Sequence, residues 1–454
     1  MHLPDIRRFG VSLAHHTILL GGVQIPHRIV ELNLNLSYAR LLADDDTDAG
    51  FRHMGRTLAA TAGTLRIMKL GLTAMGLVDA TFADFCSVGL APLIQLRRLS
   101  LNVSHNDLTN VGVAALQHAL RPTVRDLDWT LAFNKNVRFD DVDLREAHGL
   151  RSVTLDVSHT PVTHLQMPVH VTSFRVDLQW TMRSPTTADA VHPHAMFVSG
   201  IGAVRQLRLH LDCNTVSILR HIPVARGVAL DLKVDTFDMS VAAVEDMQMS
   251  IRTYNSIGML KRLDVYQDHH VAVDSLSLLP SVLAFSWNLV SLRLEMPSAT
   301  GVAPMLFNAA HYLVQLVEFG LTVRSSSSTF DVCAFAPCAR FADPNRALRL
   351  LSLDVFDVDL TDEAVAFLVD VGVDRYMKNR RNITTLRVEG SSVGPETLKA
   401  LATSVACPGF KFVSTFDVSP GCRIVPTRMT AALLRQQWLH NPFVPPTAIQ
   451  WDAA

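Results

Sequence analysis

The chain has 454 residues, and its 41 lysines and arginines nearly balance 42 aspartates and glutamates, leaving a formal net charge of -1. This balance excludes a nucleic-acid binder that relies on bulk positive charge, and the 48% apolar content excludes a disordered chain. No run of the sequence reaches the ~18 uncharged apolar residues that a membrane-spanning helix needs.

The first 28 residues come before any clear repeat of the sequence. Their apolar run, residues 11–23, contains two histidines and two glycines and does not form the apolar core of a secretory signal. Because the ends of a repeat array need segments that cover its open core, we interpret residues 1–28 as an N-terminal cap. We expect an intracellular protein, cytoplasmic in the first instance, with an organellar assembly as the alternative.

One six-residue pattern recurs through most of the chain: an apolar residue, two variable residues, an apolar residue, one variable residue and a further apolar residue. The clear copies begin at Ile29, Leu96, Val124, Leu150, Val171, Val204, Leu260, Leu289, Leu316, Leu348 and Ile383. Weaker copies begin at Leu65, Gly227 and near Phe410. The copies start about 29 residues apart on average, so the pattern predicts about 14 structural units over residues 29–437.

Apolar residues at the fourth, sixth and often eighth positions of each copy are typical of a short strand with one buried face. Leu207, Leu209 and Leu211 form one such set. A single strand of this kind cannot bury its own apolar face. Stacking the same strand of successive units builds a continuous core, so the pattern predicts a parallel sheet.

Parallel strands need crossovers, and a helix is the usual one. Three stretches between copies have helical sequences: residues 111–120, 361–371 and 395–406. Thr361 and Asp362 are N-cap candidates for the second helix, and Pro395 suits the first turn of the third. The prolines within residues 183–194 exclude a long helix there.

The repeat resembles the leucine-rich repeat family, and within it the ribonuclease-inhibitor-type branch with helix-containing units of about 28–29 residues. Residues 96–120 are the nearest match: Asn106 falls near the family's ladder asparagine, and Asn134 and Asn136 are candidates in the next unit. The resemblance implies an α/β horseshoe solenoid with a parallel β-sheet on its concave face and helices or irregular segments on its convex face. Most other copies lack the asparagine, so we expect an irregular solenoid. A protein of three separate α/β domains is the alternative.

The tail, residues 438–454, carries Trp438, Phe443 and Trp451 together with three prolines. Because aromatic side chains are costly to leave in water, the tail is predicted either to fold back as a C-terminal cap or to dock on a partner. The six cysteines are too few for a disulfide scaffold, and we interpret them as buried thiols. Cys333 and Cys338 lack the second pair that a structural zinc site needs.

No catalytic motif is present in the sequence, and we expect neither an enzyme nor a bound cofactor or metal. The stretch GIGAVR starts like a dinucleotide fingerprint but has Arg205 at the third glycine position. A basic cluster precedes the thirteenth copy: Arg375, Lys378, Arg380 and Arg381. We interpret it as a solvated loop, with contact to an acidic partner as the alternative.

Positions three, five and seven of each strand should line the face of the sheet that points away from the core. These positions are polar and mixed in sign, which suits a polar protein surface or a peptide better than an apolar ligand or single-stranded nucleic acid. The candidate partner-binding residues on the central strands are Arg175, Asp177, Arg208, His210, Asp264, Tyr266, Arg293 and Glu295. Arg175 with Asp156, and Arg293 with Asp264, are predicted to pair across neighbouring strands.

The repeat array, the missing catalytic set and a charged content of 18% predict a non-enzymatic scaffold for protein–protein interaction. An elongated chain with so little charge is expected to have part of its surface covered. We therefore expect an accessory or structural subunit of a hetero-oligomeric assembly whose partners are one or more proteins. The alternative is a free regulatory adaptor, of the ubiquitin-ligase substrate receptor or GTPase-regulator type.

Overall fold

The computed structural model describes residues 6–18, 25–41, 47–134, 139–160, 162–179, 197–212, 215–222, 227–235, 241–256, 258–266, 286–296, 313, 315–324, 348–356, 360–378, 380–389, 394–404 and 407–415. It divides into two compact units: unit 1 is Met1–Asp235 with Met239–Met259, and unit 2 is Thr236–Asp238 with Leu260–Ala454. No helix within the described ranges is long and apolar enough to cross a membrane.

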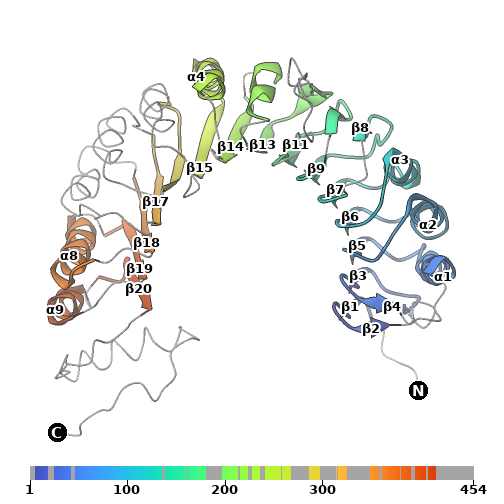
Figure 1. Ribbon diagram of the computed structural model, residues 1–454, viewed down its shortest axis with the longest axis horizontal. Coiled ribbons are helices and arrows are strands. Elements are labelled where there is room, and N and C mark those ends of the chain that lie inside the picture. The colour runs from blue at the N-terminus through green and yellow to red at the C-terminus, as the bar shows by residue number, and fades with distance from the viewer. Residues whose placement is uncertain are drawn as a thin grey trace, which may run out of the picture. The chain divides into compact units, whose positions relative to one another are not determined.

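Unit 1 is built on a parallel sheet whose strands follow one another in chain order (Figure 1). In spatial order they are β1 (Arg8–Ser12), β3 (Glu31–Asn35), β5 (Ile67–Gly71), β6 (Arg98–Asn102), β7 (Asp126–Thr130), β9 (Ser152–Asp156), β11 (Ser173–Asp177), β13 (Gln206–Leu211) and β14 (Ala229–Asp235). Each strand pairs in parallel with the next. Each stretch of sequence therefore adds one strand to the edge of the sheet, as in a solenoid-like repeat fold.

Unit 2 repeats the same plan. Its sheet has the strands β15 (Leu260–Tyr266), β16 (Ser291–Met296), β17 (Glu318–Arg324), β18 (Leu350–Phe356), β19 (Ile383–Glu389) and β20 (Phe410–Thr415). These strands are again parallel. Every one of the fourteen copies of the six-residue pattern forms a strand of one of the two units, which confirms the central expectation from the sequence.

The segment predicted to be an N-terminal cap contributes a strand of its own. Strand β1 pairs in parallel with β3, and Phe9 lies opposite Leu32. Residues 6–11 (IRRFGV) fit the six-residue pattern, so the array of strands begins before Ile29.

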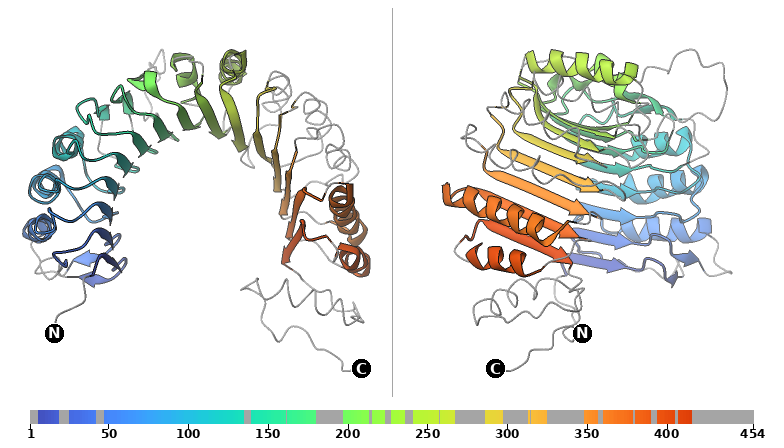
Figure 2. Two further views of the ribbon diagram at one scale, coloured as in Figure 1. Left: turned by 180° about the vertical axis from the view of Figure 1, so that it is seen from behind. Right: turned by 60° about the vertical axis from the view of Figure 1, so that its left-hand side comes forward.

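Helices cover one side of each sheet, and Figure 2 shows them on the same side of the strands within each unit. Unit 1 has α1 (Thr47–Ala59), α2 (Asp79–Phe85) with a π-turn at Cys86–Leu90, α3 (Asn110–Ala119), α4 (Val241–Ser256), and 3₁₀ turns at Ile201–Ala203 and Val216–His221. Unit 2 has α8 (Asp362–Lys378) and α9 (Pro395–Thr403). The three predicted helices are present, and α8 runs seven residues further than its sequence suggested. Thr361 caps it, since the Ala364 amide donates to the Thr361 hydroxyl at 3.3 Å.

The middle of unit 1 replaces helices with a second, three-stranded parallel sheet. Its strands are β8 (Phe139–Asp143), β10 (Val162–Gln166) and β12 (Phe197–Ser199). The copies at Leu150 and Val171 start only 21 residues apart, which leaves room for a short strand but not for a helix and its two loops. A small two-stranded sheet, β2 (Thr17–Ile18) with β4 (Arg40–Leu41), lies near the N-terminal end of the unit. Residues 183–194 lie outside the described part.

The core of each unit lies between its sheet and the crossovers. Inward positions of the strands, such as Leu207, Leu209 and Leu211 in β13, are almost fully buried, as the alternation predicts. Asn106 is also buried: its amide donates to the carbonyls of Leu72 and Val103, both at 2.9 Å. The same side chain accepts from the Met75 amide at 2.9 Å.

The thirteenth copy is shifted by two residues relative to its sequence pattern. Strand β19 places Thr385 opposite Ser352 and Arg387 opposite Asp354. Thr385, not Arg387, therefore occupies position five, and Arg387 occupies position seven. Ile383, the predicted first apolar residue of the copy, is 41% exposed.

Candidate interaction surface

The outward face of each sheet presents the predicted partner-binding residues. Figure 1 shows no labelled helix on this side of the strands in either unit. Unit 1 carries Arg175 and Asp177 on β11 and Arg208 and His210 on β13. Unit 2 carries Asp264 and Tyr266 on β15 and Arg293 and Glu295 on β16. All eight side chains are exposed or half-buried.

The four unit 1 candidates are largely engaged with neighbours. Arg208 forms an ion pair with Asp231 at 3.0 Å, and His210 Nδ1 lies 2.6 Å from an Asp177 carboxylate oxygen. The predicted pair between Arg175 and Asp156 does not form, because the register places Arg175 opposite Thr154 and Arg208. Cross-strand neutralisation leaves this part of the face with little net charge.

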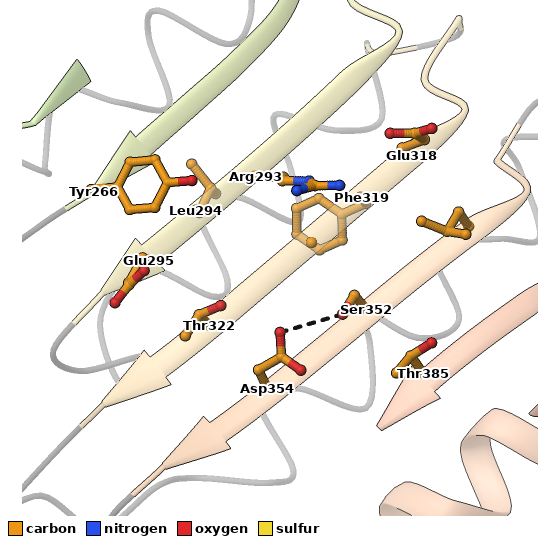
Figure 3. A pocket seen from close by; sticks show the side chains of 12 residues that line it. Tyr266, Arg293, Leu294, Glu295, Glu318, Phe319, Thr322, Ser352, Asp354 and Thr385 are labelled. Carbon is orange, nitrogen blue, oxygen red and sulfur yellow. Dashed lines mark hydrogen bonds between the residues drawn. The ribbon is translucent and has the colours of Figure 1, made fainter. Parts of the chain in front are cut away.

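The outward face of unit 2 is hollowed at Gly320 on β17. At the same level the neighbouring strands carry Arg293 and Ser352, and the glycine between them has no side chain to fill the space. The hollow has a volume of about 270 Å³. Figure 3 shows the side chains around it, with carboxylates, hydroxyls and one guanidinium pointing toward the opening. A polar depression of this size suits one or two side chains of a partner protein rather than a drug-sized ligand.

The N-terminal rim of the hollow is held by a three-residue network. The Arg262 guanidinium donates to the Ser291 hydroxyl at 3.2 Å and to a Glu318 carboxylate oxygen at 3.1 Å. The Ser291 hydroxyl also lies 3.2 Å from that carboxylate oxygen. On the far side, the Ser352 hydroxyl donates to Asp354 at 3.4 Å. These bonds fix the rim so that its shape exists before any partner arrives.

Arg293 is the cation left available at the hollow. The register places Asp264 directly opposite Arg293, but the ion pair of Asp264 is with Arg262 at 4.0 Å. The predicted Arg293–Asp264 pair is thus absent, and Arg293 forms no ion pair with any residue in the described ranges. An exposed guanidinium beside a preformed hollow is well suited to bind a carboxylate or a backbone carbonyl of a partner.

Tyr266 forms the edge of the hollow on strand β15. Its pKa lies above the ordinary tyrosine value, first because of burial and then because Asp264 and Glu295 oppose a negative phenolate, although Arg293 and Arg262 act in the other direction. Tyr266 therefore remains a neutral phenol at physiological pH. It offers an aromatic body and a hydroxyl to a partner, a combination enriched at protein interfaces.

Sequence reasoning placed the outward face but did not single out the hollow. Its additional lining residues include Glu318, Gly320, Ser352 and Thr385. The sequence feature that could have indicated the hollow is Gly320, because a glycine at position five leaves a gap between the side chains of the outward face. Thr385 could not be found this way, because the sequence pattern puts it at position three of its copy, and the two-residue shift moves it to position five, level with Ser352 and Gly320.

One member of the predicted basic cluster, Arg375, is buried in the fold rather than part of a solvated loop. Arg375 lies within α8 and is only 3% exposed. Its guanidinium donates to the Ile383 carbonyl at 3.0 Å and to the Thr384 hydroxyl at 2.9 Å. Arg380 and Arg381 follow the helix and are exposed, as expected.

Several predicted features fall outside the described residues. These are the tail residues Trp438, Phe443 and Trp451, the pair Cys333 and Cys338, and Asn136. Cys86 and Cys407 are described, and both are buried free thiols. Where the structure is described, no cluster of three or more histidine, cysteine, aspartate or glutamate side chains is arranged to hold a metal ion.

Comparison with known proteins does not assign the chain to a family. No protein-family model matches the sequence, and no curated protein is similar to it.

Proposed function

We propose that this chain is a non-enzymatic scaffold for protein–protein interaction, and a subunit of a larger protein assembly. The observation that carries the proposal is the outward face of unit 2, where Arg293 borders a preformed polar hollow at Gly320. Such a face offers shape, the available cation Arg293 and several hydroxyl and carboxylate groups. These are the elements of a specific protein contact.

We further propose that the repeats are leucine-rich repeats of the ribonuclease-inhibitor type. Two buried asparagines support this assignment. Asn106 binds backbone groups of its own turn and of the preceding unit. Asn134 does the same one unit later, donating to the Leu131 carbonyl at 2.6 Å and to the Val103 carbonyl at 3.2 Å.

Affinity purification of the tagged full-length chain from its native cells, followed by native mass spectrometry, tests the proposed function. We expect a complex of fixed stoichiometry that survives purification. Arg293→Glu should release the partner, whereas Arg380→Glu, at an exposed arginine of the same unit away from the hollow, should retain it. Recovery of the chain as a monomer would overturn the subunit proposal, and a shifting set of clients would point to a free adaptor instead.

A further inference from the structure

A row of arginines follows the edge of the unit 1 sheet at which the strands begin. In unit 1, the copies that begin at Leu65, Leu96, Val124, Leu150 and Val204 carry arginine at position two: Arg66, Arg97, Arg125, Arg151 and Arg205. Backbone hydrogen bonds join the first four of these residues one after another. The Arg97 amide donates to the Arg66 carbonyl at 2.8 Å, the Arg125 amide to the Arg97 carbonyl at 2.8 Å, and the Arg151 amide to the Arg125 carbonyl at 2.7 Å. Since adjacent strands lie ~4.8 Å apart, the arginine side chains leave the backbone at closely spaced points of one line.

The row is exposed and is not neutralised. All five side chains are exposed, and none forms an ion pair with the residues that the structure describes. Position three, the next residue along the strand, is a carboxylate on β3 and β7, but both carboxylates already form ion pairs with other arginines. Glu31 binds Arg8 at 3.2 Å, and Asp126 binds Arg98 at 2.8 Å.

The row is interrupted at one place, where the surface is recessed. Thr172 occupies position two of the copy that forms β11, between Arg151 and Arg205 in the series of backbone hydrogen bonds. A hollow of about 780 Å³ opens there, lined by these three residues together with His170 and the turns before β13 and β14. The two flanking guanidiniums can therefore reach a group seated in the recess from both sides.

We propose that this arginine row is a docking site for an extended acidic segment of a partner protein. Guanidinium groups bind carboxylates in a bidentate manner, and a linear series of them matches a linear series of carboxylates. The surface lies on unit 1 and is separate from the hollow of unit 2, so the proposal goes beyond the function proposed above and does not depend on it.

The surroundings of the row favour a narrow polyanion over a broad one. Asp126 and Asp128 lie on the outward face directly beside the row, and a nucleic-acid duplex or an anionic membrane would have to cover them. Single-stranded nucleic acid prefers aromatic platforms in its groove, whereas the positions of the row are arginine or threonine. A single extended polypeptide can follow the row without covering the neighbouring carboxylates.

The geometry also sets the length of the segment. The row from Arg66 to Arg205 crosses five strand spacings, or ~24 Å. An extended chain advances ~3.4 Å per residue, so about seven residues span the row.

Fluorescence anisotropy with the full chain and a labelled peptide of about seven glutamates, the length that spans the row, tests the proposal. We expect saturable binding that weakens as salt is added. Arg97→Glu combined with Arg125→Glu should raise the Kd by about tenfold or more, because two charge-assisted contacts become repulsive. The control, Arg56→Glu combined with Arg252→Glu, makes the same change in net charge at exposed sites on helices α1 and α4 of unit 1 and should shift the Kd by less than about twofold. Arg97→Gln combined with Arg125→Gln, a milder pair, should weaken binding less, and circular dichroism checks that all variants fold.

Absence of saturable binding, or equal losses in the row and control variants, would overturn the proposal. So would tighter, row-dependent binding of an oligothymidylate or of phosphatidylserine vesicles, which would assign the row to nucleic acid or to a membrane. Arg293→Glu in unit 2 should leave peptide binding unchanged, so failure of this proposal and failure of the proposed function can be told apart.

Discussion

His105 and Phe133 stack face to face, with ring centroids 4.4 Å apart and ring planes inclined by only 9°. Phe133 stacks in turn on His159, at 4.0 Å. All three residues occupy the same place, the third residue after strands β6, β7 and β9, and all three have a left-handed backbone with φ between 55° and 62°. A non-glycine residue in this region costs about 1–2 kcal/mol, and the ring stack offsets that cost.

Phe133→Ala tests the stabilising role of this stack. The variant keeps the strained backbone but loses both ring contacts, each worth about 0.5–1.5 kcal/mol, so unit 1 should lose about 1–3 kcal/mol of local stability. Hydrogen-exchange mass spectrometry of β7 and β9 measures the effect. The control is Ala74→Gly, at the same turn position with φ of 53°, which relieves strain and should cause no loss. Unchanged exchange in Phe133→Ala would contradict the role of the stack.

Asp362 lies in the first turn of α8, yet its carboxylate caps α9. It accepts hydrogen bonds from the amides of Gly394 at 2.7 Å, Glu396 at 2.8 Å and Thr397 at 3.0 Å. We expect Asp362→Ala to destabilise α9 by about 1 kcal/mol, the usual cost of a lost N-cap. Hydrogen exchange of residues 395–403 measures the loss, and Asp370→Ala, at an exposed aspartate of the same helix, is the control.

The contribution of Asp362 should also depend on pH. Burial alone raises the pKa of Asp362, but the hydrogen bonds from Thr397, Glu396 and Gly394 outweigh it, so the pKa lies below its ordinary value. A carboxyl whose folded pKa is lowered stabilises the fold fully above its unfolded pKa, about 3.9, and loses this contribution as the pH falls through the folded pKa. The stability difference between the natural chain and Asp362→Ala should therefore be largest at neutral pH and shrink below about pH 4. A constant difference across this range would contradict the assignment.

The strands could be predicted from the sequence because alternation of apolar residues is a local signal. Strand β1 could have been predicted in the same way, because residues 6–11 carry the pattern, with Ile6, Phe9 and Val11 at the apolar positions. The two-residue shift of β19 could not be predicted from the sequence. Thr384 occupies an inward position there and is 6% exposed, while Ile383 points outward, so the apolar pattern indicates the wrong register.

Side-chain partners on the outward face were harder to predict than the face itself. The sequence places Arg175 and Asp156 on strands that prove to be neighbours, but an ion pair also needs the two residues to lie opposite each other. Arg175 lies opposite Thr154, and Asp156 is two residues further along that strand. Arg293 and Asp264 do lie opposite each other, yet Asp264 pairs with Arg262 on its own strand instead. Such competition is decided by side-chain reach, which strand periodicity does not specify.

Filling the hollow at Gly320 tests whether a partner enters it. A Cβ at this position would lie 3.3 Å from Cγ of Arg293, whose flexible side chain can move aside, so Gly320→Gln should fold with thermal unfolding nearly unchanged. We expect this variant to lose the co-purifying partner. Gly320→Ala adds only a methyl group and should retain it, and equal retention by both variants would show that the partner binds elsewhere.

Removal of the buried arginine should destabilise unit 2 far more than removal of its exposed neighbour. Burial lowers the pKa of Arg375 to about 10, which still leaves it charged at neutral pH. It joins α8 to β19 and to the segment just before β18, because it also donates to the Leu348 carbonyl at 3.3 Å. Arg375→Ala leaves buried carbonyls without donors and should cost about 3 kcal/mol, whereas Arg380→Ala, at an exposed site, should change stability by less than about 0.5 kcal/mol. Urea denaturation followed by hydrogen exchange of β18 and β19 measures both, and similar losses in the two variants would show that the buried contacts of Arg375 do not hold this part of the fold.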